Sequence, residues 1–123
     1  MKRLALCLVL TTVTLGGFAA GRATADANDG VTLVVRHTVG NFDKWKAGYD
    51  GHEGERRKFG WTSATVLTDA GDPTHVVVVG KVKSLAQAKD FTSSPSLKET
   101  MKKIGVIGPP DIAFLKLVEQ KAY

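Results

Sequence analysis

Hydrophobic runs that do not alternate with polar residues mark the first and third predicted strands. Residues 31–35 read Val-Thr-Leu-Val-Val, and residues 76–79 are four consecutive valines. Such runs are typical of strands that are buried on both faces. The surrounding pattern predicts the order strand, helix, strand, strand, helix, strand. Two helical regions can cover only one face of a small sheet, so we expect a second copy of the chain to cover the other.

Turn and capping signals set the expected limits of the strands. Strands are predicted over 31–39, 62–68, 75–83 and 111–119. The polar residues 69–74 predict a turn between the second and third strands. Gly108-Pro109-Pro110 predicts a stiff, extended connector before the last strand. This order predicts an α+β fold: a ferredoxin-like βαββαβ sandwich with a four-stranded antiparallel sheet, which pairs with a second copy as a dimeric α/β barrel.

The first helix is predicted over 42–59. Asn41 or Asp43 is expected to cap its start, and Gly60 is expected to end it. The second helical region is expected to be interrupted at Ser94-Pro95, where serine can cap a new helix and proline suits its first turn.

Three glycines, Gly48, Gly51 and Gly54, recur at a spacing of three inside the first predicted helix. Each costs roughly 1 kcal/mol relative to alanine in a helix interior. They predict either very close packing along this strip or an interruption of the helix near His52, and the sequence leaves both open.

Residues 1–25 have the pattern of a cleavable signal peptide. Lys2-Arg3 form a positive start, residues 4–15 form an apolar run, and Ala23-Thr24-Ala25 is a small-x-small cleavage site. The run is too short and too interrupted by Thr and Gly to span a membrane. We therefore expect an exported protein, periplasmic or secreted, without membrane association after cleavage; an uncleaved N-terminal anchor is the alternative.

Cleavage leaves a short flexible segment, 26–30, and a single domain, 31–123. The only cysteine, Cys7, belongs to the leader, so the exported chain has no disulfide. The leader also carries three of the 17 basic residues, which reduces the net charge from +5 to about +2. No basic stripe alternates with aromatic residues, so we expect no nucleic-acid partner.

One stripe of the first helix combines aromatic and ionisable residues. Its members recur at spacings of three and four: Phe42, Trp45, Tyr49, His52, Arg56 and Phe59. Such spacing places them on the face that packs on the sheet. A buried histidine and a buried arginine need partners or a ligand. His52 is either a core histidine or a proton acceptor, and Arg56 is either a residue reaching out to solvent or a clamp for an oxyanion.

Arg36 and His37 are neighbours on the first strand and therefore point to opposite faces. Val31, Leu33 and Val35 share the face of His37, and this more apolar face should pack under the helices. We expect His37 to lie near His52 and Arg36 to face the interior of the barrel. A structural ion pair for Arg36 and a hydrogen-bonded edge position for His37 are the alternatives.

Several kinds of chemistry lack a signal in the sequence. His37, His52 and His75 have no metal-ligand spacing, and His52-Glu53 is followed by Arg56 where a zinc-binding motif needs histidine. We expect no metal site. The chain also lacks a glycine-rich phosphate loop and a recognisable nucleophile with a nearby base.

Several segments together resemble the dimeric α/β-barrel superfamily, and within it the antibiotic-biosynthesis-monooxygenase-like proteins, often labelled cyclases. The segments are 34–39, 41–46, His52 with Arg56, Phe91, and 94–110. The resemblance covers nearly all of residues 31–119. It implies the fold, a homodimer and a ligand cavity between sheet and helices or inside the barrel.

Better-known members of this superfamily oxidise electron-rich aromatic molecules without metal or flavin, so the resemblance implies no cofactor. Its haem-degrading branch uses an Asn, a Trp and a His. This chain has Asn41, Trp45 and His52, but it lacks the histidine which that branch carries on the second helix. Haem degradation is therefore the less favoured interpretation.

Two functional hypotheses follow for the cavity. The first is a cofactor-free oxygenase or cyclase for a small aromatic or polyketide-like molecule. The second is a non-catalytic binding module for a small hydrophobic ligand. The candidate catalytic residues are His52, His37, Arg36 and Arg56. The candidate ligand-binding residues are Trp45, Tyr49, Phe59 and Phe91.

Overall fold

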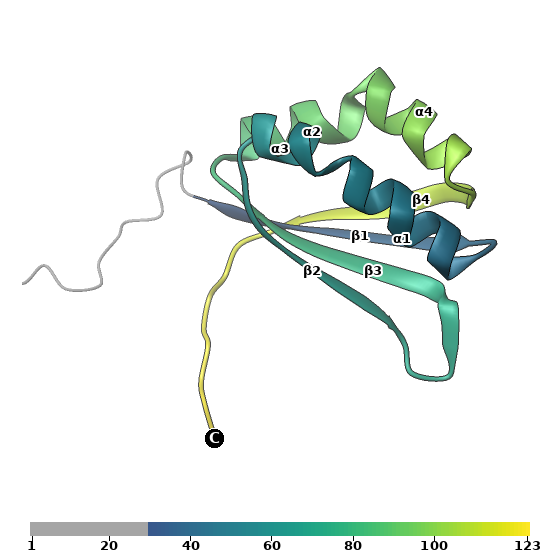
Figure 1. Ribbon diagram of the computed structural model, residues 1–123. Helices are drawn as coiled ribbons and strands as arrows, with labels where there is room; N and C mark the ends of the chain where they lie inside the picture. The colour runs from purple at the N-terminus through teal and green to yellow at the C-terminus, as the bar shows by residue number, and fades with distance from the viewer. Residues whose placement is uncertain (1–29) are drawn as a thin grey trace, which may run out of the picture.

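Helices cover one face of a four-stranded antiparallel sheet in this α+β fold (Figure 1). The computed structural model describes residues 30–123, so the signal peptide predicted for 1–25 lies outside the described residues. The strands are β1 (Val31–Val39), β2 (Trp61–Asp69), β3 (Asp72–Val82) and β4 (Val106–Leu115). The helices are α1 (Phe42–Gly51), α2 (Glu53–Lys58), α3 (Leu85–Ser93) and α4 (Pro95–Lys103). The predicted ferredoxin-like order is confirmed.

The two valine-rich strands lie at the centre of the sheet, whose order is β2-β3-β1-β4. Val35 of β1 pairs with Val78 of β3 on one side and with Ile112 of β4 on the other. Central strands are flanked by neighbours on both edges, so their side chains are buried more easily than those of edge strands. This placement explains why β1 and β3 carry the longest apolar runs.

The core fills the layer between the sheet and the helices. Alternate residues of β1 and β3 point into it, and α1, α3 and α4 each contribute large or close-packed side chains. The buried hydrophobic residues are Val31, Leu33, Val35, Val39, Trp45, Trp61, Val76, Val78, Val82, Ala88, Phe91 and Leu97.

Asn41 and Ser84 cap the helices that follow them, whereas Ser94 precedes α4 without forming a side-chain cap hydrogen bond. Asn41 caps α1, because its side-chain Oδ1 accepts a hydrogen bond from the backbone N–H of Lys44 at 2.9 Å. Ser84 caps α3 in the same way through the N–H of Gln87. Gly60 ends the first helical region with φ +84°, a conformation that disfavours residues with a Cβ.

The first helical region is two helices rather than one continuous helix over 42–59. The break lies at His52, whose backbone N–H donates to Tyr49 O at 3.1 Å, three residues back instead of four. Gly51 and Gly54 flank the break, and an added Cβ at either position would meet no other atom within 4 Å. Low helix propensity without compensating packing accounts for the interruption.

The last strand begins and ends earlier than the predicted 111–119. β4 starts at Val106 and includes Gly108-Pro109-Pro110, which the sequence had suggested as a connector. The pairing with β1 shifts register between Arg36 and Thr38, opposite these residues. Proline lacks the N–H that a central strand needs, but it is tolerated at a bulge on an edge strand. Residues 116–123 form no strand.

The sheet face opposite the helices, here called the open face, carries Val34, Val77 and Val79 at its centre. All three side chains are partly exposed, while Arg36 and Lys81 beside them are exposed. In Figure 1 the C-terminal segment runs away from the sheet on this side. A second copy over this face stays a prediction. Within residues 30–123, no helix combines the length and hydrophobicity needed to cross a membrane.

Candidate functional site

A small inner cavity lies between the sheet and the helices, with a volume of about 50 Å³. Its walls come from β1, β2, β3 and all four helical segments. The lining residues are Val35, His37, Trp45, Tyr49, His52, Arg56, Trp61, Val78, Phe91, Leu97, Thr100, Met101 and Ile104. Most of this wall is aliphatic or aromatic, so the two histidines and the arginine are the groups in it that can carry charge.

His37 projects from β1 into the inner cavity, on the face that the alternation of β1 predicts. Its ring lies against Trp45, with ring centroids 5.3 Å apart. Both ring nitrogens are buried, and neither has a hydrogen-bond partner within the described residues. Burial lowers the pKa of His37 below 6.5. The imidazole is therefore neutral at pH 7, with one N–H donor and one free lone pair.

His52 reaches the same cavity from the break between α1 and α2. Its Nε2 is buried and unpaired within residues 30–123, and its ring centroid lies 6.2 Å from that of Phe91. The pKa of His52 is lowered, first by burial and second by the positive charge of Arg56, while Glu55 opposes the shift. A neutral histidine beside a cation can accept a proton from a ligand whose anion the cation stabilises.

Arg56 is the buried charged residue of the described chain, with 7% of its surface exposed. One guanidinium nitrogen donates to Tyr49 O at 2.8 Å, and the guanidinium carbon lies 3.7 Å from the centroid of the Tyr49 ring. No carboxylate of residues 30–123 forms an ion pair with it. Burial lowers the pKa of Arg56, yet guanidinium keeps its proton in proteins. The site therefore holds a fixed positive charge with uncommitted N–H donors.

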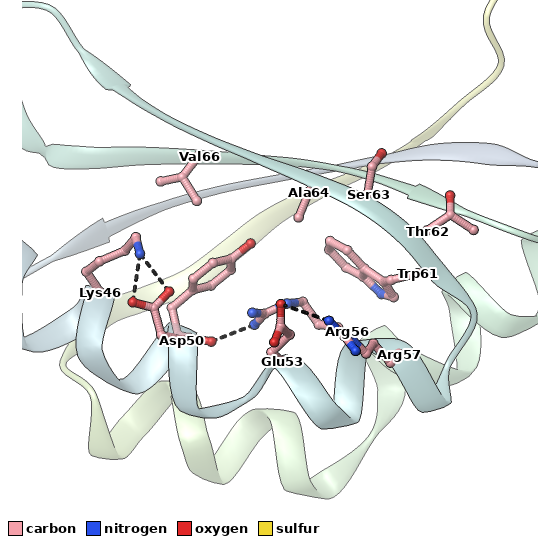
Figure 2. A pocket seen from close by; sticks show the side chains of 11 residues that line it. Lys46, Asp50, Glu53, Arg56, Arg57, Trp61, Thr62, Ser63, Ala64 and Val66 are labelled. Atoms are coloured by element: carbon pink, nitrogen blue, oxygen red, sulfur yellow. Dashed lines mark hydrogen bonds and ion pairs between the residues drawn. The ribbon is translucent and has the colours of Figure 1, made fainter.

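An outer groove of about 490 Å³ lies between β2 and the helices α1 and α2. Figure 2 shows its charged residues on the helices, across from Val66 and Ala64 of β2. The lining residues are Lys46, Tyr49, Asp50, Glu53, Arg56, Arg57, Trp61, Thr62, Ser63, Ala64 and Val66.

The charges along the rim of the groove neutralise one another in pairs. Lys46 bonds Asp50 at 2.6 Å, and Arg57 lies 3.6 Å from Glu53 (Figure 2). Arg56 is thus the groove cation whose charge is not matched by a neighbouring carboxylate of the described residues. Tyr49, Arg56 and Trp61 line both the groove and the inner cavity, so the two spaces adjoin at these side chains.

Arg36 lies on the open face, away from the cavity that holds His37 and His52. It pairs in register with Val77 of β3 and Asp111 of β4. It lines a hollow of about 600 Å³ on that face. The structure therefore separates Arg36 from His52, and Arg56 is the arginine that shares a cavity with this histidine.

The candidate ligand-binding residues Phe59 and Phe91 also differ in position. Phe91 lines the inner cavity and packs against Trp61 with ring centroids 5.1 Å apart. Phe59 packs on the ring of Phe91, 5.6 Å between centroids, and lines neither the cavity nor the groove. Phe59 therefore supports the wall that Phe91 forms rather than facing a ligand itself.

The three histidines do not converge. His75 lies at the far end of β3, where Asp72 and the Thr38 hydroxyl are its neighbours at 3.2 and 3.3 Å. Within residues 30–123, no three His, Cys, Asp or Glu side chains gather as a metal site would require.

Trp61 is a site residue that the sequence pattern did not single out. It covers Gly80 so closely that an added Cβ there would lie 2.7 Å from Cη2 of the indole. Its Nε1 is buried and unpaired within the described chain. A lone glycine after four valines was the available signal, because a glycine inside a strand often marks the close approach of another group.

This fold is that of antibiotic-biosynthesis-monooxygenase-like proteins, as the sequence predicts. One similar structure is SnoaB, a cofactor-independent oxygenase from Streptomyces nogalater. It shares 12% identity, covers 75% of this chain and 96% of its own, and superposes with a TM-score of 0.63.

Two further similar crystal structures are of proteins whose predicted activity is that of antibiotic biosynthesis monooxygenases. That from Bordetella bronchiseptica shares 15% identity over 74% of this chain and 99% of its own, with a TM-score of 0.65. That from Caulobacter crescentus shares 13% identity over 76% and 93%, with a TM-score of 0.61. At these identities the comparison establishes the fold. No protein-family model matches the chain, and no curated protein matches it either.

Proposed function

We propose that this protein is a cofactor-independent oxygenase or cyclase that acts on a small aromatic, polyketide-like molecule with an acidic hydroxyl group. One observation carries the proposal: a neutral imidazole, His52, and an unmatched buried guanidinium, Arg56, line the same cavity, one helical turn apart. The similarity to SnoaB, a cofactor-independent oxygenase, supports the same reaction class.

The chemistry assigned to these residues begins with proton removal. The free Nε2 of His52 accepts the hydroxyl proton, and the guanidinium of Arg56 stabilises the resulting oxyanion. The electron-rich anion is then oxidised by dioxygen. When a ring CH₂ group becomes a carbonyl, one oxygen atom enters the product and the other leaves as water with the two hydrogens. Dioxygen is the only oxidant that this balance needs.

The aromatic residues at the junction of the groove and the cavity bind the ring system. Tyr49 and Trp61 form apolar surfaces at the junction of the groove and the cavity, and Trp45 and Phe91 close the cavity behind them. Stacking on such side chains contributes affinity without specifying one substrate. His37 is a second base or a hydrogen-bond donor to an anionic intermediate.

Oxygen consumption in the presence of a panel of electron-rich polycyclic phenols tests the proposal. Replacing His52 by Ala should lower kcat by about 10²–10⁴-fold, the usual contribution of a general base, while ligand affinity is largely retained. Replacing Arg56 by Gln should both lower kcat and raise KM. Replacing His75, which lines neither the cavity nor the groove, by Ala is the matched control and should leave both constants unchanged.

Two results would count against an enzyme. If the wild-type protein binds these phenols but neither consumes oxygen nor converts them to a cyclised product, the site is a binding module. If His52→Ala abolishes binding itself, the histidine is part of a recognition surface rather than a base. A hemin titration without a shift of the Soret band would remove haem binding from consideration.

The proposed working form is an exported homodimer. The leader pattern at 1–25 supports export. The apolar centre of the open face, Val34, Val77 and Val79, supports a second copy packed over it. Native mass spectrometry tests both points: the protein recovered from an exporting host should begin near Asp26 and have twice the monomer mass. The same spectrum would reveal a copurified ligand.

A further inference from the structure

The inner cavity is too small for the aromatic substrate that the proposed function requires. Its volume is about 50 Å³, compared with about 490 Å³ for the outer groove. A protein cavity of about 150 Å³ accommodates benzene, and one water occupies about 30 Å³ of the liquid. The inner cavity therefore has room for a diatomic molecule or a water, and of the cavity and the groove only the groove is large enough for the aromatic ring.

The inner cavity adjoins the outer groove. Tyr49, Arg56 and Trp61 line both spaces, and they are the side chains that separate the two. Two reactants held on either side of this boundary are close enough to react without diffusing further, which is the main advantage of binding both.

The cavity wall suits a small uncharged gas. Val35, Val78, Leu97, Met101 and Ile104 supply an aliphatic surface. An apolar diatomic molecule loses little by leaving water for such a surface, whereas a water molecule needs two to four hydrogen-bond partners.

The polar atoms of the cavity wall suit the negatively charged species that forms when dioxygen is reduced. Dioxygen gains negative charge when an electron-rich substrate reduces it, and the charged form needs hydrogen-bond donors. His37 and His52 present unpaired ring nitrogens within the described residues, and Arg56 presents N–H groups. We propose that the inner cavity is the dioxygen site of this protein and that the outer groove holds the ring system of the organic substrate, whose hydroxyl group points past Tyr49 and Trp61 toward His52. This inference rests on the proposed function, because an oxygenase needs both sites.

Dioxygen itself is the probe for the test, because it is paramagnetic and accelerates the nuclear relaxation of methyl groups near it. Val35 and Val78 line the cavity, while Val76 and Val82 belong to the same core without lining it. All four side chains are at most 4% exposed. Under dissolved oxygen, the relaxation of Val35 and Val78 methyl groups should increase at least twofold more than that of Val76 and Val82.

A variant that fills the cavity provides a second test of dioxygen binding. Ile104→Phe enlarges a wall residue and should reduce the enhancement at Val35 and Val78 to the level of Val76. Val118→Phe adds a ring on the C-terminal segment, where the side chain is 94% exposed, and should change nothing. If Ile104→Phe does not fold, the wild-type comparison alone decides.

Equal enhancement at all four valines would overturn the proposal. So would a long-lived water in the cavity, detected through cross-relaxation with the Val35 and Val78 methyl groups and undisplaced by dissolved oxygen. Both measurements use the protein without organic substrate. If dioxygen enters the cavity but the protein consumes no oxygen with any substrate, the proposed oxygenase is refuted and the cavity assignment stands. If the protein consumes oxygen but the valine methyl groups show equal relaxation enhancement, only the cavity assignment is refuted.

Discussion

Replacing Gly48 by Ala should destabilise the protein, although alanine is the better helix former. Gly48 lies on the side of α1 that faces Ile104, the residue after α4. A Cβ at this position would overlap Cγ2 of Ile104 and lie 2.9 Å from its Cβ, so the isoleucine or the helix would have to move. Gly51 and Gly54 offer the contrast, since an added Cβ there meets nothing within 4 Å.

The expected magnitudes follow from these contacts. Each Gly→Ala change in a helix gains up to about 1 kcal/mol from propensity. At Gly54 nothing opposes this gain, so Gly54→Ala should stabilise by about 0.4–1 kcal/mol. At Gly48 overpacking costs about 1–3 kcal/mol. Since the propensity gain is common to both variants, Gly48→Ala should be less stable than Gly54→Ala by about 1–3 kcal/mol.

Urea unfolding followed by circular dichroism measures the difference. In a parallel thermal unfolding experiment, a change of 1 kcal/mol in the free energy of unfolding corresponds to about 4–8 °C in Tm for a domain of this size. All variants should be compared at one protein concentration, because dimer formation would add concentration-dependent stability. In an Ile104→Ala background the cost of Gly48→Ala should be smaller, since the overlapping Cγ2 is absent. A Gly48→Ala protein as stable as Gly54→Ala would refute the packing argument.

Three further predictions concern the site and its supports. Proton titration by NMR should give midpoints below 6.5 for His37 and His52. Because the unfolded state binds these protons more readily, the free energy of unfolding should fall as pH drops below about 6.5. A free energy of unfolding that rises over this range would contradict the burial argument. Gly80→Ala should destabilise by about 1–3 kcal/mol and change the fluorescence of Trp61, which lies over it. Asn41→Ala should cost about 1 kcal/mol in urea unfolding through loss of the α1 cap, while an unchanged midpoint would show the cap to be dispensable.

Local patterns were sufficient to predict much of the site. The three- and four-residue spacing of Trp45, Tyr49, His52 and Arg56 predicted their common face, because helix geometry fixes which residues lie together. Trp45 and Arg56 are buried, and the other two are partly buried. The alternation of β1 likewise placed His37 under the helices and Arg36 on the open face.

The sequence failed where the outcome depended on contacts between distant segments. Phe59 shares the helical stripe, yet it packs on Phe91 and lines no cavity. The sequence left open whether His37 would have a partner, and its two unpaired nitrogens appear only once β1 and α1 are packed together. Side-chain volume at such contacts is set by both partners, so one segment alone does not contain the answer.

The sequence by itself determined the order of the elements, the residues of β1 that face the core and the cap of α1, because those features arise from interactions within a few residues. Only the tertiary structure decided the register of β4 across its bulge, the seat of Trp61 on Gly80, and the division between a small inner cavity and a larger groove. These features depend on how closely packed surfaces from distant parts of the chain fit together, and a difference of one methyl group can open or close such a space.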